Sequence, residues 1–76
     1  MSTVEIEYCV PCGFRDRALD VARAVLNACE GDLDGLTLVM GAHGIFQVRV
    51  DGTTVYDKDE REFDIDAIAR TVRAEA

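Results

Sequence analysis

The hydrophobic and polar positions of this chain predict four extended segments. Apolar and polar residues alternate over 3–8 and again over 45–50, as in strands that bury one face. Residues 36–40 are mostly apolar, which is typical of a strand whose two faces are both covered. Residues 53–56 form the fourth segment. The pattern therefore predicts one small sheet.

Two further segments have the three- and four-residue spacing of amphipathic helices. Apolar side chains recur in this way from Phe14 to Cys29, and Gly31 is expected to end this helix in the left-handed conformation. Asp64 is a suitable N-cap for a second helix. The apolar face of that second helix consists of Ile65, Ile68, Ala69 and Val72.

The order of these elements, β-α-β-β-β-α, predicts an α/β (α+β) fold in a single domain over residues 1–76. A right-handed β-α-β crossover makes the first two strands parallel. Asp51-Gly52 joins the last two strands, because this dipeptide is a strong hairpin signal. We expect a four-stranded mixed sheet in the order 2-1-3-4, with both helices on one face.

The composition narrows the range of partners. The 76 residues include 15 Asp plus Glu against 8 Lys plus Arg, which gives a net charge of −7. This charge makes nucleic acid and anionic lipid poor partners. No apolar run reaches the roughly 20 residues of a membrane span, and residues 1–7 lack the pattern of a signal peptide. We therefore predict a cytoplasmic protein, in which disulfides are transient rather than structural.

The basic residues are seven Arg and a single Lys, Lys58, a bias that resembles proteins of salt-loving archaea. An ordinary acidic protein is the alternative. Because like charges destabilise a compact chain unless salt screens them, the halophilic interpretation predicts that thermal stability rises with salt. Melting temperatures measured from low to molar potassium chloride test this prediction, and a constant melting temperature would contradict it.

Two cysteines stand where the first strand ends and the first helix begins. Cys9 and Cys12 are separated by two residues, which brings their sulfurs within disulfide reach if the segment is wound on the first helical turn. The free N–H groups and positive dipole of a helix start would stabilise a thiolate there. Pro11 stiffens the turn, and Gly13 completes it. In a β-α-β context this motif indicates thiol redox chemistry at Cys9 and Cys12.

A zinc site and inert thiols are the alternatives. Zinc needs four ligands, and only Cys9 and Cys12 have metal-ligand spacing. Cys29 lies roughly 25 Å along the helix from Cys12 at the helical rise per residue, and is expected to be a small buried hydrophobe. His43 is either an exposed loop residue or a group near the cysteines that assists thiolate formation. We predict no metal and no bound organic cofactor.

Four segments carry a resemblance that spans nearly the whole chain. They are VEIEYCVPCGF at residues 4–14, GIFQV at 44–48, DG at 51–52 and VYD at 55–57. Together they resemble the selenoprotein W-like, or Rdx-type, family of small thioredoxin-like proteins. The resemblance implies a thioredoxin-like fold and a role as a thiol or selenol oxidoreductase. It also implies partners of the glutathione type.

The resemblance bears on which cysteine attacks. In selenium-containing members the selenocysteine takes the position of Cys12, which makes Cys12 the reactive residue. Thioredoxin chemistry instead makes the first cysteine of the motif, Cys9, the attacking thiolate and Cys12 the resolving thiol. We favour Cys9, because we expect it to lie nearer the open end of the turn.

Three functions are consistent with these observations. The first is a small cytosolic thiol-disulfide oxidoreductase that cycles between a dithiol and a Cys9–Cys12 disulfide. Its partners would be a protein or low-molecular-weight thiol, such as a glutathione-like thiol or a reductase. The second is a redox-sensing binding module, with the exposed hairpin face and Tyr56 as its contact surface. The third is a zinc-stabilised structural domain. The sequence assigns no oligomeric state.

Overall fold

A computed structural model describes residues 2–76, and its elements follow the predicted order. They are β1 (Ser2–Cys9), α1 (Arg15–Cys29), the 3₁₀ turn η1 (Glu30–Asp32), β2 (Leu33–Gly41), β3 (Phe46–Val50), β4 (Thr53–Asp57) and α2 (Ile65–Glu75). The strands form one sheet in the order β2-β1-β3-β4, which confirms the prediction. β1 is parallel to β2 and antiparallel to β3, and β3 is antiparallel to β4.

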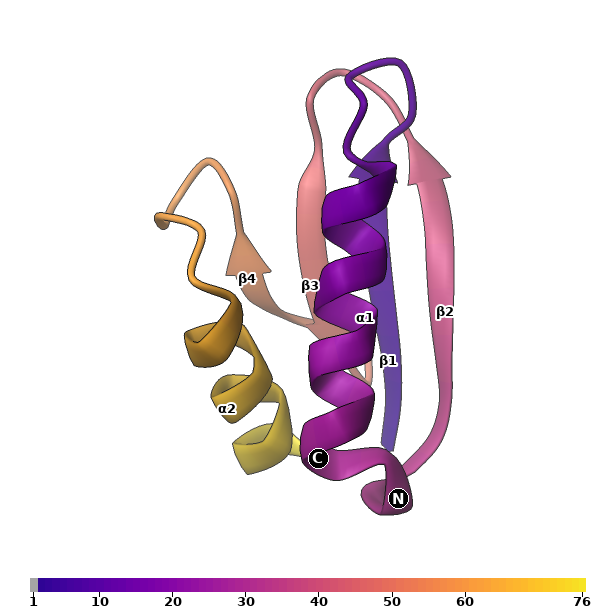
Figure 1. The fold of residues 1–76 in the computed structure, drawn as a ribbon, viewed down its shortest axis with the longest axis vertical. Coiled ribbons are helices and arrows are strands. Elements are labelled where there is room, and N and C mark those ends of the chain that lie inside the picture. Colours follow the sequence, from indigo (N-terminus) through magenta and orange to yellow (C-terminus); the bar gives the residue numbers. More distant parts are fainter. Residues whose placement is uncertain (1) are drawn as a thin grey trace.

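One face of the sheet carries the hydrophobic core, and Figure 1 shows both helices on that face. Alternation along the strands produces this arrangement, because every second side chain points to the same side. Val4, Ile6 and Val48 are fully buried on the sheet, and Val21 and Val25 of α1 are fully buried against it. The predicted packing of both helices on one face is therefore confirmed.

The β3–β4 hairpin turns at Asp51 and Gly52, as predicted. Both residues have a positive φ, 50° and 84°, as a two-residue type I′ turn requires. The carboxylate of Asp51 accepts a hydrogen bond from the backbone N–H of Thr3 at 3.0 Å. This bond, followed by one from Ser2, lowers the pKa of Asp51 below its usual value. The turn is thereby joined to the start of β1.

The helix ends differ in part from the prediction. α1 begins at Arg15 with Phe14 as its N-cap residue, one position later than expected. Gly31 does not adopt the left-handed conformation. α1 instead runs into η1, where the N–H of Leu33 donates to the carbonyl of Glu30. The Asp64 N-cap is confirmed, because its carboxylate accepts from the N–H of Ala67 at 3.1 Å. Within residues 2–76, no helix has the length and apolar character needed to cross a membrane.

β2 contradicts the prediction that both of its faces are covered. It forms an edge of the sheet, and none of its nine residues is fully buried. Leu36 and Leu38 are half-buried against the core, whereas Met40 is 76% exposed. The apolar run arises from residues that lie at the margin of the core rather than within it.

Candidate functional site

The predicted redox motif lies at one end of the sheet, where Cys9 and Cys12 form a disulfide. Cys9 is the last residue of β1, and Cys12 lies three residues before the first residue of α1. Their Cα atoms are 5.3 Å apart, within the range of ordinary protein disulfides. The β1–α1 connection therefore brings the two sulfurs together without any other part of the chain.

The geometry of this connection corrects the sequence prediction. The motif is not wound on the first turn of α1, but forms a separate turn in which the N–H of Gly13 donates to the carbonyl of Val10 at 3.2 Å. Pro11 takes the second position of this turn, which its fixed φ suits, and Gly13 has a φ of 77°. Cys12 thus lies at the top of a tight turn, ahead of the free N–H groups of α1.

The β2–β3 loop supports the motif from the side. The N–H of Cys9 donates to the carbonyl of Ile45 at 2.8 Å, and the N–H of Val10 donates to the carbonyl of Gly41 at 3.0 Å. A Cβ added at Gly41 would lie 2.7 Å from Cγ2 of Ile45 and 2.9 Å from Oε2 of Glu7. Glycine at this position therefore allows the loop to close over the end of the sheet, a role that the sequence analysis missed.

His43 lies in the same loop, between the two residues whose carbonyls hold the motif. It is exposed and has a φ of 62°. Figure 1 shows that this loop and the β1–α1 connection occupy the same end of the molecule. The loop that carries His43 therefore lies at the motif end, while a part for His43 in thiolate formation stays a prediction.

The exposure of the two cysteines is the reverse of what we expected. Cys9 has 0% of its surface exposed, whereas Cys12 is exposed. The reason is that Cys9 still belongs to the sheet, and the loop carrying Ile45 lies against it. The prediction that Cys9 lies nearer the open end of the turn, which favoured it as the attacking thiol, is therefore wrong.

An open depression of about 410 Å³ adjoins the motif. It is lined by Tyr8, Val10, Gly13, Arg15, Asp16 and Met40. Two of these, Val10 and Met40, are large apolar side chains that are 49% and 76% exposed. The end of the molecule that carries the disulfide therefore also presents an apolar surface to solvent.

Cys29 is distant from the motif and behaves as the sequence predicts. It ends α1, it is buried, and its thiol donates to the carbonyl of Val25 at 3.4 Å. Burial, followed by the Asp32 carboxylate, raises the pKa of Cys29, and Arg73 opposes this shift. A thiol that is buried and protonated at neutral pH is a poor nucleophile, so Cys29 fits a packing role.

Tyr56 does not form the exposed contact surface that we expected. Only 4% of it is exposed, its ring lies 6.2 Å from that of Phe46, and burial raises the pKa of its hydroxyl. It belongs to an edge-to-face aromatic cluster that also includes Phe63. A partner that docks on the hairpin would therefore not reach this side chain.

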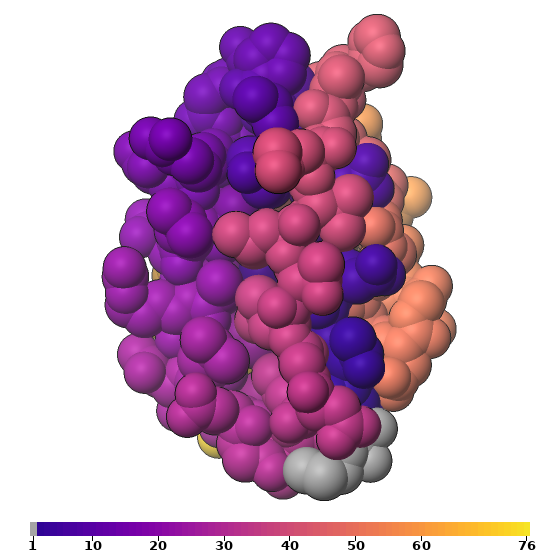
Figure 2. Space-filling view, turned by 90° about the vertical axis from the view of Figure 1, so that its right-hand side faces the viewer, coloured from indigo at the N-terminus to yellow at the C-terminus, as the bar shows by residue number. Residues whose placement is uncertain are grey.

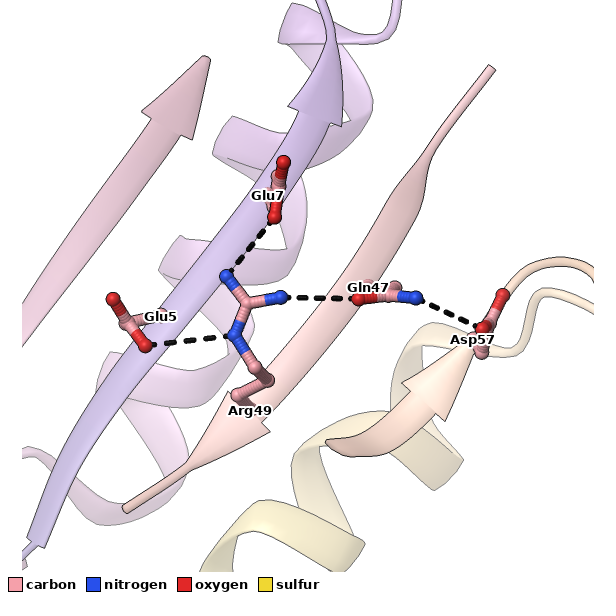
Figure 3. A network of polar contacts seen from close by, with 5 residues as sticks. All are labelled: Glu5, Glu7, Gln47, Arg49 and Asp57. Atoms are coloured by element: carbon pink, nitrogen blue, oxygen red, sulfur yellow. Dashed lines mark hydrogen bonds and ion pairs between the residues drawn. The ribbon is translucent and has the colours of Figure 1, made fainter. Parts of the chain in front are cut away.

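The sheet face without helices carries a polar network, which Figure 3 shows. Arg49 contacts the carboxylates of Glu7 at 3.1 Å and Glu5 at 3.5 Å, and also donates to Gln47 at 3.0 Å. Gln47 in turn donates to Asp57 at 3.0 Å. The alternation in residues 45–50 predicts only that Arg49 and Gln47 point away from the core. The fold also brings charges from three strands together around one half-buried guanidinium.

Replacing Arg49 with Met is expected to lower the free energy of unfolding by about 1–2 kcal/mol, because two neighbouring carboxylates lose their counter-charge. Arg23→Met is the matched control, since its 3.3 Å pair with Asp20 is exposed. We expect a loss below about 0.5 kcal/mol there. Urea titrations of both variants provide the measurement, and equal losses would show that the network adds no stability.

The fold and the motif define a class: a small β-α-β-β-β-α protein with a Cys-x-x-Cys disulfide at the end of its first strand. The model of the Rdx family matches residues 3–74, so the chain belongs to the Rdx family. Membership of this family and the Cys9–Cys12 disulfide together suggest a redox role. No curated protein matches the chain.

Two crystal structures are similar to this chain over nearly its full length. A protein from Bordetella parapertussis is 26% identical, with a TM-score of 0.89, over 99% of this chain and 98% of the other. A selenoprotein W-related protein from Vibrio cholerae is 17% identical, with a TM-score of 0.87, over 97% of this chain and 95% of the other. The second likeness concerns the fold alone.

Proposed function

We propose that this protein is a small thiol-disulfide oxidoreductase of the cytoplasm in which Cys12 attacks and Cys9 resolves. The observation that carries the proposal is the unequal exposure of the disulfide-bonded pair, with Cys12 exposed and Cys9 fully buried. A mixed disulfide with a partner must form at a sulfur that the partner can reach, and the resolving sulfur needs only to reach its neighbour.

The reaction balances in two steps. In the first, the Cys12 thiolate attacks a partner disulfide, forms the bond between Cys12 and the partner, and releases one partner sulfur as a thiolate that takes a proton. In the second, the Cys9 thiolate attacks the Cys12 sulfur and releases the other partner sulfur. The partner gains two electrons and the protein is left with the Cys9–Cys12 disulfide. A cellular thiol or a reductase returns the protein to the dithiol by the reverse exchange.

The surface around Cys12 supports a partner that is at least partly apolar. Val10 and Met40 flank the depression beside the motif and are both exposed. Burial of these side chains by a partner would stabilise the mixed disulfide. A protein partner can offer such contacts, whereas a small anionic thiol of the glutathione type would approach a chain of net charge −7 without them.

Equilibration of the protein in graded thiol and disulfide buffers at high salt tests the proposal. The samples are acid-trapped and weighed intact. We expect one two-electron transition that involves Cys9 and Cys12 and leaves Cys29 reduced. If no disulfide forms anywhere in the series, the oxidoreductase proposal is contradicted. The metal-binding and inert-thiol alternatives would then remain.

Turnover separates the enzyme from a redox-sensing module. An oxidoreductase reduces a model disulfide many times per chain when a reductant is supplied, whereas a sensor reacts once. We expect multiple turnovers. A single turnover per chain with a normal redox transition would favour the sensor.

A further inference from the structure

Part of the exposed apolar surface lies along α1 and the edge strand β2. Among residues 2–76, the exposed large hydrophobic residues are Val10, Leu19, Leu26, Met40 and Phe63. Leu19 and Leu26 belong to α1, and Met40 belongs to the edge strand β2. Leu36 and Leu38 of β2 are only half-buried. We call the apolar surface formed by α1 and β2 the α1/β2 patch. It consists of Leu19, Leu26, Leu36, Leu38 and Met40.

Helix geometry places the two exposed leucines over β2. The guanidinium of Arg17 lies 4.6 Å from the ring of Phe63, so Arg17 marks the side of α1 that faces α2. Leu19 follows two residues later, about 200° around the helix, and is therefore on the opposite side. Leu26 lies seven residues beyond Leu19, on the same line. Figure 2 shows α1 and β2 side by side on this face of the molecule.

Within residues 2–76 no strand pairs with the outer edge of β2. The register against β1 shifts at Asp34, but from Gly35 to Met40 the strand is regular and has no charge or Pro that would block pairing. The carbonyl of Gly41 points towards β1, where it accepts from Val10. Alternate residues point the other way, so the N–H and C=O groups of Leu36, Leu38 and Met40 face outward. β2 contains no Lys, Arg or Pro, and its one charged residue is Asp34. Sheet edges that stay unpaired usually carry charged side chains, especially Lys, or Pro.

We propose that a second copy of this chain binds the α1/β2 patch, with the two β2 strands paired antiparallel about a two-fold axis at Thr37. In this register Leu36 pairs with Leu38 of the second copy, and Met40 lies opposite the irregular start of β2 at Asp34 of the second copy. No two carboxylates face each other across the strands. The product is one continuous eight-stranded sheet with the helices of both copies on the same face.

The same axis makes the two α1 helices complementary. The middle of α1 lies at the level of the middle of β2, because α1 runs back along β1 from the motif end to the start of β2. Thr37 is the central residue of β2. An antiparallel pair of α1 helices then sets Leu19 against Leu26 of the second copy. At their ends, Arg15 of one copy would approach Glu30 of the other, which sets opposite charges at both ends of the interface. The 3.8 Å contact of Arg15 with its own Asp16 is exposed and long, so it leaves Arg15 able to pair with Glu30.

The spacing allows these side chains to meet. The two β1 strands would be three strand spacings apart, about 14 Å in all, and α1 lies over β1 and β2. Leucine side chains from both helices extend into that gap. Arg23, which lies near the axis, is already paired with its own Asp20 at 3.3 Å, so its charge is largely balanced.

The net charge of the chain predicts how salt affects this dimer, and the topology predicts where the redox motifs lie in it. Each copy has a net charge of −7, so salt should strengthen the association by screening the repulsion between copies. The Cys9–Cys12 disulfide lies at the end of the sheet rather than on its edge. The two motifs would thus be at opposite ends of the dimer. Met40 and Arg15 line the depression beside the motif and would also belong to the interface, so the dimer would cover part of the surface proposed for a redox partner.

Sedimentation equilibrium of the full chain over a concentration range up to millimolar, in low and molar potassium chloride, tests the proposal. We expect a reversible monomer–dimer equilibrium that is tighter at high salt. Met40→Pro removes an outward N–H without touching the β1 pairing and should raise the dissociation constant at least tenfold. Met40→Ala loses the same side chain but keeps that N–H, so we expect less than a threefold change.

A charge exchange tests the register. Arg15→Glu and Glu30→Arg should each weaken the dimer at low salt, and the double variant should restore it. A single-chain mass under all conditions would overturn the proposal, as would equal effects of the proline and alanine variants at Met40. Protection of β2 amides from hydrogen exchange by a cysteine-containing peptide, with the protein monomeric, would assign this edge to a substrate instead.

Discussion

Replacing Cys12 with Ser is expected to remove the reaction with external disulfides. Replacing Cys9 with Ser is expected to stop the reaction at the mixed disulfide between Cys12 and the partner. In the Cys9→Ser variant the exposed Cys12 still attacks a partner, but no resolving thiol remains. A stable mixed disulfide should therefore accumulate. In Cys12→Ser the remaining motif thiol is buried, and an opening cost of about 3 kcal/mol would slow its reaction by roughly 100-fold.

Intact mass after exposure to a model disulfide measures both outcomes, together with the rate of alkylation of the reduced chains. Cys29→Ser is the matched control, because it removes a cysteine that is buried at the far end of α1. The serine hydroxyl at position 29 can still donate to the carbonyl of Val25, so we expect full turnover in this variant. A mixed disulfide in Cys12→Ser but not in Cys9→Ser would restore Cys9 as the attacking thiol.

Replacing Phe46 with Ala is expected to cause a large loss of stability. Phe46 is 1% exposed, and its ring packs edge-to-face on Phe14, Tyr56 and Phe63 at 6.1–6.2 Å. Loss of a buried phenylalanine typically costs 3–5 kcal/mol, so we expect about 4 kcal/mol. In a domain of this size that lowers the melting temperature by roughly 15–30 °C. Thermal unfolding at high salt provides the measurement.

Phe63→Ala is the control within the same cluster. Phe63 is 38% exposed, so its removal should cost only about 1–2 kcal/mol. If Phe46→Ala fails to fold, Phe46→Leu keeps part of the buried volume and should still lose more stability than Phe63→Ala. A smaller loss at position 46 than at position 63 would contradict the view that Phe46 anchors the cluster.

The elements of the fold could be predicted because each is encoded locally. Alternation in residues 3–8 and 45–50 and the repeat from Phe14 to Cys29 reflect which side chains leave water. Asp51-Gly52 fixes the hairpin by backbone conformation alone. The errors concern features that depend on neighbours, such as the burial of β2. Nothing local distinguishes the apolar run of an edge strand such as β2 from that of a covered strand.

For the site, the sequence by itself determined which two thiols can pair and where along the chain they stand. The spacing of Cys9 and Cys12 at the end of a strand pattern was sufficient, since disulfide reach over two intervening residues is a local property. Only the tertiary structure decided which thiol is accessible. Exposure depends on what packs against each sulfur, and the loop that carries Ile45 comes from a segment more than thirty residues away.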